Sequence, residues 1–135
     1  MKIVVTGPKS SGKTCIGTAL STRLDIPFAD LDDLVLDRAR DQGLPADSCA
    51  RLFRTLGEDA FRRLERETIA ALDRQGFFVL ATGGSTLLDH RSRHLLRPAS
   101  LWVYLKAGAD RLWERIEQDA LPAYLQGTDN PRAQF

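Results

Sequence analysis

The octapeptide Gly7-Pro8-Lys9-Ser10-Ser11-Gly12-Lys13-Thr14 fits the pattern G-x-x-x-x-G-K-[ST] at every required position. Gly7 and Gly12 allow the backbone to turn and to approach an anion without a Cβ in the way. The N–H groups of residues 10–14 can then point at phosphate oxygens, with the positive end of a helix dipole behind them. Lys13 supplies a mobile charge for the β- and γ-phosphates, and the Thr14 hydroxyl can bind Mg²⁺. These residues predict a site for ATP and Mg²⁺.

The segments on either side of this loop provide the context that the pattern needs. Residues 2–6 are rich in β-branched side chains and predict a buried strand. Residues 15–24 carry apolar side chains at helical spacing, namely Ile16, Ala19, Leu20 and Leu24. The order strand, glycine-rich loop and helix favours a phosphate-binding loop over a chance turn. For Thr6, Lys9 and Ser11 two interpretations stay open, a ligand contact or a solvated loop position.

Composition limits the classes of protein that come into question. The chain has 135 residues, 43% of them hydrophobic and 27% charged, which is ordinary for one globular domain spanning residues 1–135. A net charge of +1 without a dense Lys/Arg cluster predicts no nucleic-acid partner. The apolar runs are too short to span a bilayer, and the first expected strand begins at residue 2, so we expect a cytoplasmic monomer without a targeting segment or membrane partner. Cys15 and Cys49 form no disulfide framework, and we expect Cys15 to be buried as a small hydrophobic residue.

Three carboxylates follow a short strand expected at residues 27–30 and precede a helix expected at 34–40. Asp30, Asp32 and Asp33 lie within four residues. One of them is expected to cap the helix, but three are more than capping needs. The end of a strand beside a phosphate loop is where α/β sheets bind ligands, so we expect at least two of them to be functional.

The rest of the chain continues the alternation of strands and helices. We predict helices at residues 48–54, 60–74 and 110–118. We predict buried strands at residues 77–81 and 100–105. The charged residues of the 60–74 helix, Glu65 among them, are expected to be mostly solvated. Gly83 and Gly84 follow the strand at 77–81 and indicate either a simple turn or a second close approach to a ligand. Strands alternating with helices predict a parallel sheet covered on both faces.

With these landmarks in order, the sequence resembles the shikimate kinases, small P-loop enzymes related to the nucleoside monophosphate kinases. The likeness runs from residue 1 to about 119. It rests on the phosphate loop, on residues 28–32 (F-x-D-x-D), on residues 57–65 (G-E-x-x-F-R-x-x-E) and on residues 82–85, which are close to the family's three glycines. The resemblance implies a three-layer α/β/α P-loop kinase fold with a parallel sheet, and an enzyme that transfers a phosphoryl group from Mg-ATP to the 3-hydroxyl of shikimate.

The resemblance also implies roles for individual residues. Asp30 would help to organise the Mg²⁺ shell with Thr14, and Asp32 would hold a substrate hydroxyl and accept its proton. Arg62 would bind the substrate carboxylate, while Gly83 and Gly84 would offer backbone N–H groups. The residues implied on the nucleotide side are Gly7, Ser10, Ser11, Gly12, Lys13, Thr14, Cys15 and Arg115, the last of which would stack on adenine.

Some positions depart from the family pattern. Ser85 replaces the third glycine, and Leu121-Pro122 stands in the lid, expected at about 119–135, where the family has Arg-Pro. Arg132 is a candidate substitute for that arginine. The family's following helix, with a second carboxylate-binding arginine, has no counterpart in these residues. Two alternatives therefore stay open: a related kinase for another small acceptor, such as gluconate, a nucleoside monophosphate or an amino-acid hydroxyl, and a nucleotide-binding module without kinase activity.

Overall fold

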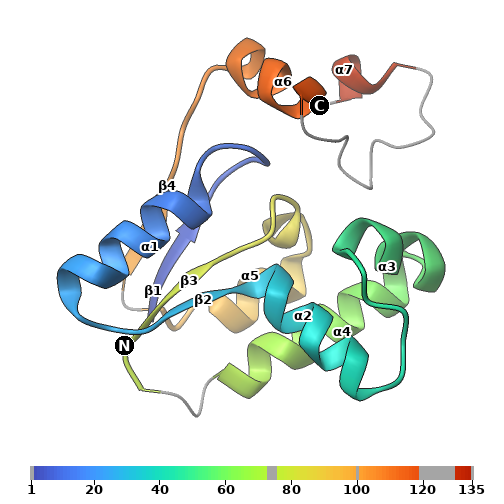
Figure 1. The fold of residues 1–135 in the computed structure, drawn as a ribbon, viewed down its shortest axis with the longest axis horizontal. Helices are drawn as coiled ribbons and strands as arrows, with labels where there is room; N and C mark the ends of the chain where they lie inside the picture. The colour runs from blue at the N-terminus through green and yellow to red at the C-terminus, as the bar shows by residue number, and fades with distance from the viewer. Residues whose placement is uncertain (1, 73–75, 100, 119–129, 135) are drawn as a thin grey trace.

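The computed structural model describes residues 2–72, 76–99, 101–118 and 130–134 (Figure 1). The elements are β1 (Lys2–Thr6), α1 (Lys13–Leu24), β2 (Phe28–Asp30), α2 (Leu31–Asp41), α3 (Cys49–Leu56), α4 (Glu58–Ala71), β3 (Phe78–Ala81), the 3₁₀ turn η2 (Thr86–Leu88), α5 (His90–Leu96), β4 (Leu101–Tyr104), α6 (Ala109–Gln118) and α7 (Pro131–Gln134). The four predicted strands are confirmed within one or two residues at each end. The predicted end of the long helix near residue 74 and most of the expected lid lie outside the described residues.

The strands form one parallel sheet in the order β2-β3-β1-β4. Strand β1 pairs with β3 on one side and with β4 on the other, with Val4 opposite Leu80 and Trp102. Because all four strands run in the same direction, their carboxyl ends lie along one edge of the sheet. That edge therefore carries the phosphate loop after β1, the carboxylates after β2 and the two glycines after β3.

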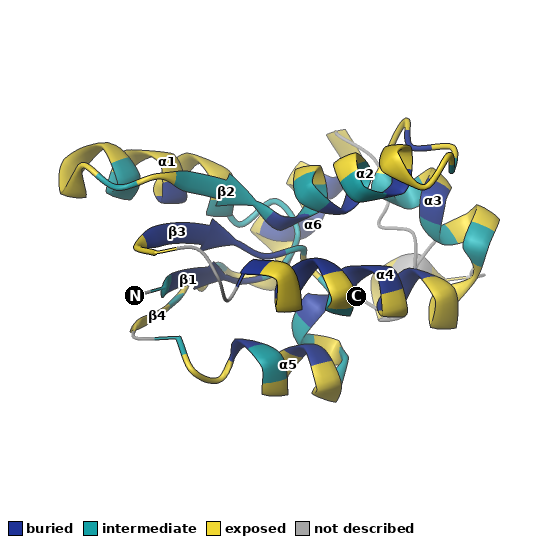
Figure 2. Cartoon of the chain, turned by 90° about the horizontal axis from the view of Figure 1, so that it is seen from below, coloured by how far each residue is buried: buried dark blue, intermediate teal, exposed yellow. Residues whose placement is uncertain are grey.

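Helices cover the two faces of the sheet (Figure 2). On one face, Ile3, Val5 and Val79 pack with Leu20 of α1 and its neighbours. On the other face, the alternate strand residues Val4 and Leu80 join the larger core formed with α2, α4 and α5. This alternation follows from the period of two in a strand. The predicted three-layer α/β/α fold is confirmed.

Helix α1 buries a different side from the one that its apolar spacing predicts. Ile16 and Leu24 are 44% and 47% exposed, and the residue buried in this helix is Gly17. A Cβ at Gly17 would lie 2.6 Å from the Phe28 ring, so the helix packs on β2 through the smallest residue it has. Cys15 is exposed rather than buried, because the turn that places Gly17 against the sheet points Cys15 away from it.

Strand β4 was predicted to be buried, and this is wrong for the described part of the chain. Leu101 and Tyr104 are 52% and 62% exposed because β4 forms the edge of the described sheet. The short helix α7 occupies residues that lack a helical pattern and were expected to be loop. Within the described residues, every helix is too short or too polar to cross a membrane.

Candidate active site

The phosphate loop connects β1 to α1. Gly12 is the N-cap of α1 and has a φ of 95°, a left-handed conformation that favours glycine. Gly7 is buried against the carbonyl group of Leu105, the residue that follows β4. Ser10, which is not a glycine, also has a positive φ of 63°. The loop thus holds the backbone shape that lets successive N–H groups surround an anion.

Lys13 begins α1 and turns back over the loop. Its Nζ donates a hydrogen bond to the carbonyl oxygen of Pro8 at 2.6 Å. Burial lowers the pKa of Lys13, and the attraction of Asp32 and Asp30 only partly opposes this shift. The ammonium group is therefore partly desolvated and lies close to Asp30, at the end of β2, and to Asp32, at the start of α2.

Asp30 links the phosphate loop to the neighbouring strand. It is the N-cap of α2, because its Oδ1 accepts a hydrogen bond from the Asp32 N–H at 3.0 Å. Its Oδ2 accepts a hydrogen bond from the Thr14 hydroxyl at 2.9 Å. One carboxylate thus serves both as the expected cap and as an oxygen beside Thr14. Within the described residues, no group of three or more His, Cys, Asp or Glu side chains could hold a metal by itself. Mg²⁺ typically takes only one or two protein oxygens together with phosphate oxygens, so the Thr14–Asp30 pair is of the right kind.

Asp32 lies in the first turn of α2, because the helix begins at Leu31 and not at residue 34 as predicted. Burial raises the pKa of this carboxyl group to about 6, and the negative charges of Asp30 and Glu65 act in the same direction. A Cβ added at Gly83 would lie 2.8 Å from the Asp32 Oδ1, so glycine is needed there to let the carboxylate stand against the turn. Gly83 therefore positions Asp32 by leaving space for it.

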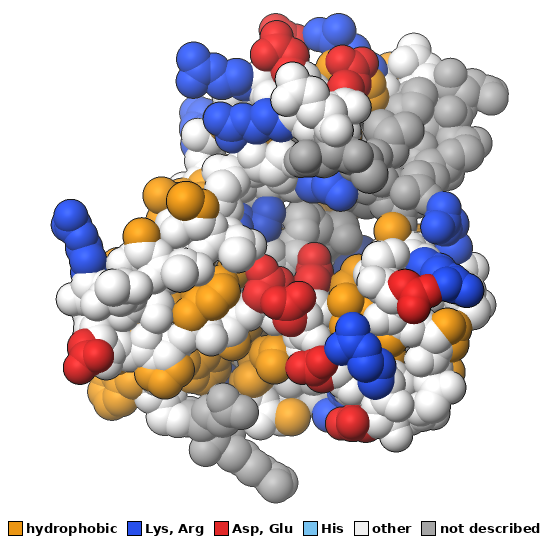
Figure 3. Space-filling view, in the orientation of Figure 1, with side chains coloured by type: hydrophobic (Ala, Val, Ile, Leu, Met, Phe, Trp, Pro, Cys, Tyr) orange, Lys and Arg blue, Asp and Glu red, His pale blue; other side chains and the backbone are white. Residues whose placement is uncertain are grey.

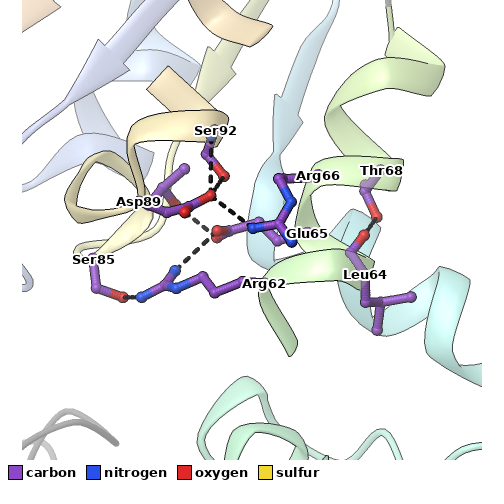
Figure 4. Close-up of polar contacts among 9 residues, drawn as sticks. Arg62, Leu64, Glu65, Arg66, Thr68, Ser85, Asp89 and Ser92 are labelled. Atoms are coloured by element: carbon purple, nitrogen blue, oxygen red, sulfur yellow. Dashed lines mark hydrogen bonds and ion pairs between the residues drawn. The ribbon is translucent and has the colours of Figure 1, made fainter. Parts of the chain in front are cut away.

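A buried polar network joins α4 to the turn after β3 (Figure 4). Arg62 Nη1 donates to Glu65 Oε1 at 2.9 Å, and Arg62 Nη2 donates to the Ser85 hydroxyl at 3.0 Å. The Thr86 hydroxyl donates to Glu65 Oε2 at 2.9 Å. The side chains of Arg62 and Glu65 are only 7% and 2% exposed, so these two are exceptions to the expectation that most of the charged residues of this helix are solvated. The buried charge of Glu65 is tolerated because Arg62 pairs with it and both of its oxygens accept hydrogen bonds.

A second ion pair fixes the next helix to the same region. Arg66 Nη1 lies 3.1 Å from Asp89 Oδ2, and Asp89 also caps α5 by accepting hydrogen bonds from the N–H and hydroxyl groups of Ser92 (Figure 4). These hydrogen bonds and Arg66 outweigh burial and lower the pKa of Asp89 to about 2. Helix α4 is thus bonded to Ser85, Thr86 and Asp89, at the end of the glycine turn and just after it.

At least three cavities open along this edge of the sheet, and two of them are lined by the residues described above or by Arg115. The smaller, of about 110 Å³, is lined by Lys9, Asp32, Cys49, Ala50, Phe53, Phe61, Glu65, Gly83, Gly84 and Ser85. We call it the acceptor cavity. The other, of about 690 Å³, lies between the phosphate loop and α6 and is lined by Ser11, Lys106, Ala107, Gly108, Asp110, Arg111, Glu114 and Arg115. Only the larger one has the volume of a typical nucleotide-sized pocket, so the two cavities suit a nucleotide and a small second molecule.

Arg115 lies at the border of the larger cavity. Its Nη1 donates to the Ser10 carbonyl oxygen at 2.9 Å and so ties α6 to the phosphate loop. Arg132 does not reach the loop in this structure, because its Nη2 forms an ion pair with Asp110 Oδ1 at 2.7 Å. The residues Leu121 and Pro122 lie outside the described part of the chain.

The structure brings most of the sequence-predicted residues together. Lys13, Asp30, Asp32 and the two glycines meet at one edge of the sheet, and the predicted proximity of the loop to the carboxylates is confirmed. Arg62 is not among the residues that line the acceptor cavity, but its guanidinium contacts the lining residue Ser85.

Several residues at the site were not predicted. Those with no predicted role are Glu65, Ser85, Cys49, Phe53 and Phe61. The separation of Arg62 and Glu65 by three residues was the available signal for their pairing, because residues at that spacing face each other on a helix. The hydrophobic residues of α3 carry no comparable signal, since an apolar helix face is ordinarily part of the core.

The fold and the paired cavities define a P-loop phosphotransferase. The family model for shikimate kinase matches residues 9–134, and the chain belongs to the shikimate kinase family. The predicted family is confirmed, and with it the class of enzyme, a kinase with an alcohol group as acceptor.

Relatives and solved structures agree with this assignment. The chain is 35% identical over 127 residues to a shikimate kinase of Xylella fastidiosa, covering 94% of this chain and 67% of that protein. It is 37% identical over 135 residues to one of Burkholderia thailandensis, covering all of this chain and 70% of the relative. It superposes with a TM-score of 0.77 and 28% identity on the Acinetobacter baumannii shikimate kinase in complex with shikimate, covering 98% of this chain and 70% of that one. The chain therefore spans about two-thirds of the length of these relatives.

A more distant structure shows how far the fold itself extends. A gluconokinase from Sinorhizobium meliloti superposes with a TM-score of 0.56 at 24% identity, over 98% of this chain and 69% of that one. At this identity the likeness concerns the fold alone, so it does not favour gluconate as the acceptor.

Proposed function

We propose that the chain transfers the γ-phosphoryl group of Mg-ATP to the 3-hydroxyl of shikimate. The observation that carries this proposal is the position of Asp32, which lines a small acceptor cavity and lies within electrostatic reach of Lys13 on the phosphate loop. Membership of the shikimate kinase family implies the use of ATP, and the name of the Acinetobacter baumannii relative supports shikimate as the acceptor. The single domain, the monomeric state and the cytoplasmic location stay predictions.

The residues of the phosphate loop fit a bound nucleotide. The Ser11 hydroxyl is buried and has no hydrogen-bond partner among the described residues, and Lys13 Nζ donates a hydrogen bond to the carbonyl oxygen of Pro8 in the loop. Ser10, Ser11, Gly12 and Thr14 would offer N–H groups to the phosphates, and Thr14 with Asp30 would offer oxygens to Mg²⁺. Mg-ATP supplies the transferable group and the positive charge that neutralises its oxygens.

The base half of the nucleotide would lie in the larger cavity. Arg115 lines this cavity and is bonded to the loop, and its planar guanidinium can stack on an adenine ring while it keeps its hydrogen bond to the Ser10 carbonyl. Gly7 would let the loop approach the phosphates closely, and Cys15, at the start of α1, would contribute through its backbone.

Asp32 would act as the general base for the acceptor hydroxyl. A pKa of about 6 leaves the carboxylate ionised at neutral pH and still basic enough to accept a proton when the hydroxyl oxygen attacks. Lys13 lies close enough to stabilise the negative charge that Asp32 and the transferring group share. Removal of the proton and charge stabilisation would thus come from two residues in the first turns of α1 and α2, the helices that follow β1 and β2.

Arg62, Gly83 and Gly84 would hold the acceptor. Arg62 Nη2 reaches the Ser85 hydroxyl at the border of the cavity, so a carboxylate placed on this turn would lie near a guanidinium that is already oriented by Glu65. The N–H groups of the glycine turn would add hydrogen bonds to the same ligand. A small hydroxy acid with a carboxylate at one end and a hydroxyl at the other suits this arrangement.

Acceptor-dependent release of ADP tests the proposal. We expect Mg-ATP turnover to be stimulated by shikimate and not by gluconate, nucleoside monophosphates or free serine. The Asp32→Asn variant should keep its affinity for ATP and lose this stimulation, because an amide cannot accept the proton. Stimulation by another member of the panel would replace shikimate as the acceptor. Binding of ATP with no stimulation by any of them would favour a nucleotide-binding module.

A further inference from the structure

We propose that Lys9 is a second cation for the carboxylate of the acceptor, opposite Arg62 across the Gly84–Ser85 turn. The inference rests on the proposed function, in which the acceptor cavity takes a small hydroxy acid. It assigns a substrate-binding role to a loop residue whose position alone fits a solvated side chain equally well.

Lys9 is the one basic residue among those that line the acceptor cavity in the described part of the chain. It is half-buried, and among the residues that the structure describes it has no hydrogen bond or ion pair. In the space-filling view a hollow opens between the half of the molecule that carries the phosphate loop and the half that carries α3, with basic and acidic side chains on opposite rims (Figure 3). A lysine without a partner in such a cavity is available for an anionic ligand.

The backbone geometry places Lys9 next to the turn that Arg62 also touches. A Cβ at Gly84 would lie 2.9 Å from the Lys9 backbone nitrogen and 3.2 Å from its Cα. The next residue, Ser85, accepts the hydrogen bond from Arg62 Nη2. Each residue of the dipeptide Gly84–Ser85 thus lies next to a cation-bearing residue, and an anion bound to its backbone would be near both Lys9 and Arg62.

The charges around the cavity require a second cation. Arg62 is already paired with Glu65, so together they contribute no net charge, and Asp32 is ionised at neutral pH with a pKa of about 6. Lys13 lies near Asp32 and Asp30 but would also face the phosphates, so a bound carboxylate would add a further negative charge to a partly desolvated space, which is unfavourable. The positive charge of Lys9 would offset the negative charge of the bound carboxylate. Its charge is felt deep in the site, because its repulsion adds to burial in lowering the pKa of Lys13.

The test compares shikimate with its methyl ester, which keeps the hydroxyl groups and lacks the charge. Affinities are measured by calorimetry in the presence of Mg-ADP, so that no transfer occurs. We expect the unmodified chain to bind shikimate more tightly than the ester. In Lys9→Met this preference should fall by about 10- to 100-fold, the loss typical of a hydrogen bond between charged groups. The affinity for the ester should change little. Lys9→Arg should keep most of the preference. Lys2→Met is the control, because this substitution removes the same charge and Lys2 begins β1, at the opposite end of the sheet.

The possible outcomes separate this inference from the proposed function. A preference that survives in Lys9→Met, or its absence from the unmodified chain, overturns the role of Lys9. Binding of shikimate without any ADP release in a turnover assay overturns the proposed function alone. The preference for shikimate over its methyl ester then still tests the role of Lys9. Failure of the unmodified chain to bind shikimate overturns both.

Discussion

Replacing Asp32 by Asn should make the protein more stable while it abolishes turnover. Burial raises the pKa of Asp32 in the folded state from its usual 3.8 to about 6. The folded state therefore holds this proton more tightly than the unfolded state, and the favourable contribution of the protonated group is lost as the pH rises through about 6. At about 1.4 kcal/mol per pKa unit, ionised Asp32 costs the fold about 3 kcal/mol at neutral pH. Asparagine avoids this cost, but it also loses about 0.3–1 kcal/mol of attraction between the carboxylate and the amino end of α2.

The net gain is about 2 kcal/mol, or roughly 7 °C in melting temperature for a chain of 135 residues. Thermal unfolding followed by circular dichroism between pH 4.5 and 7.5 measures it. The difference between Asp32→Asn and the unmodified protein should grow by about 2 kcal/mol over that range and then level off. Asp33→Asn is the control, because Asp33 is exposed in the same helical turn and has the same charge, and its charge is the smallest of the causes that shift the pKa of Asp32. A difference that does not change with pH, or a less stable variant at pH 7.5, would refute the reasoning.

Two further substitutions test the loop and the turn. Lys13→Ala should raise the dissociation constant for ATP by about 10- to 100-fold and eliminate turnover, because the loss of a charge-assisted hydrogen bond to phosphate costs about 1.5–3 kcal/mol; calorimetry with an unchanged affinity would contradict this. Gly83→Ala should lower both kcat and stability, the latter by about 1–3 kcal/mol, because its Cβ would lie 2.8 Å from Asp32 Oδ1 and 2.9 Å from the Thr86 hydroxyl oxygen. Gly76→Ala, which meets no atom within 4 Å, is the matched control, and equal kinetics for the two variants would count against the positioning role of Gly83.

The architecture was predictable because several signals in the sequence agree. The apolar runs at β1 and β3 lack polar interruptions, as parallel strands buried on both faces do, and each is followed by a glycine-containing loop. Parallel strands place their carboxyl ends at one edge, so Lys13, Asp30 and Gly83 had to meet once the strands were correct. The same rule explains why the positions of the candidate residues were easier to predict than the burial of their surroundings.

The errors concern contacts between segments far apart in the sequence. Periodicity ranks side chains by hydrophobicity, and it cannot recognise that Gly17 packs on Phe28 because it has no side chain. Glu65 is a charged residue of a kind that is ordinarily solvated on a helix. Here its buried charge is compensated by hydrogen bonds from Arg62 and Thr86, and Thr86 lies in another element. The apolar residues of β4 do not reveal that it is an edge of the described sheet.

The departure at Ser85 has a clear structural consequence. A glycine in that position would leave Arg62 Nη2 without its partner at 3.0 Å, so the serine hydroxyl contributes to the orientation of a buried guanidinium. The pattern of the sequence marks Ser85 as a deviation from three glycines. Only the structure indicates that the hydroxyl belongs to the network that holds the acceptor cavity together.

The central claim is that the acceptor is shikimate and that its 3-hydroxyl receives the phosphoryl group. Phosphorus–proton correlation NMR of the mixture formed from Mg-ATP and shikimate tests it most directly, because it identifies the oxygen that carries the phosphate. We predict one phosphate monoester, at the 3-hydroxyl, formed by the unmodified chain and absent with Lys13→Ala. A monoester at another hydroxyl, or ADP formed with shikimate left unmodified, would contradict the account.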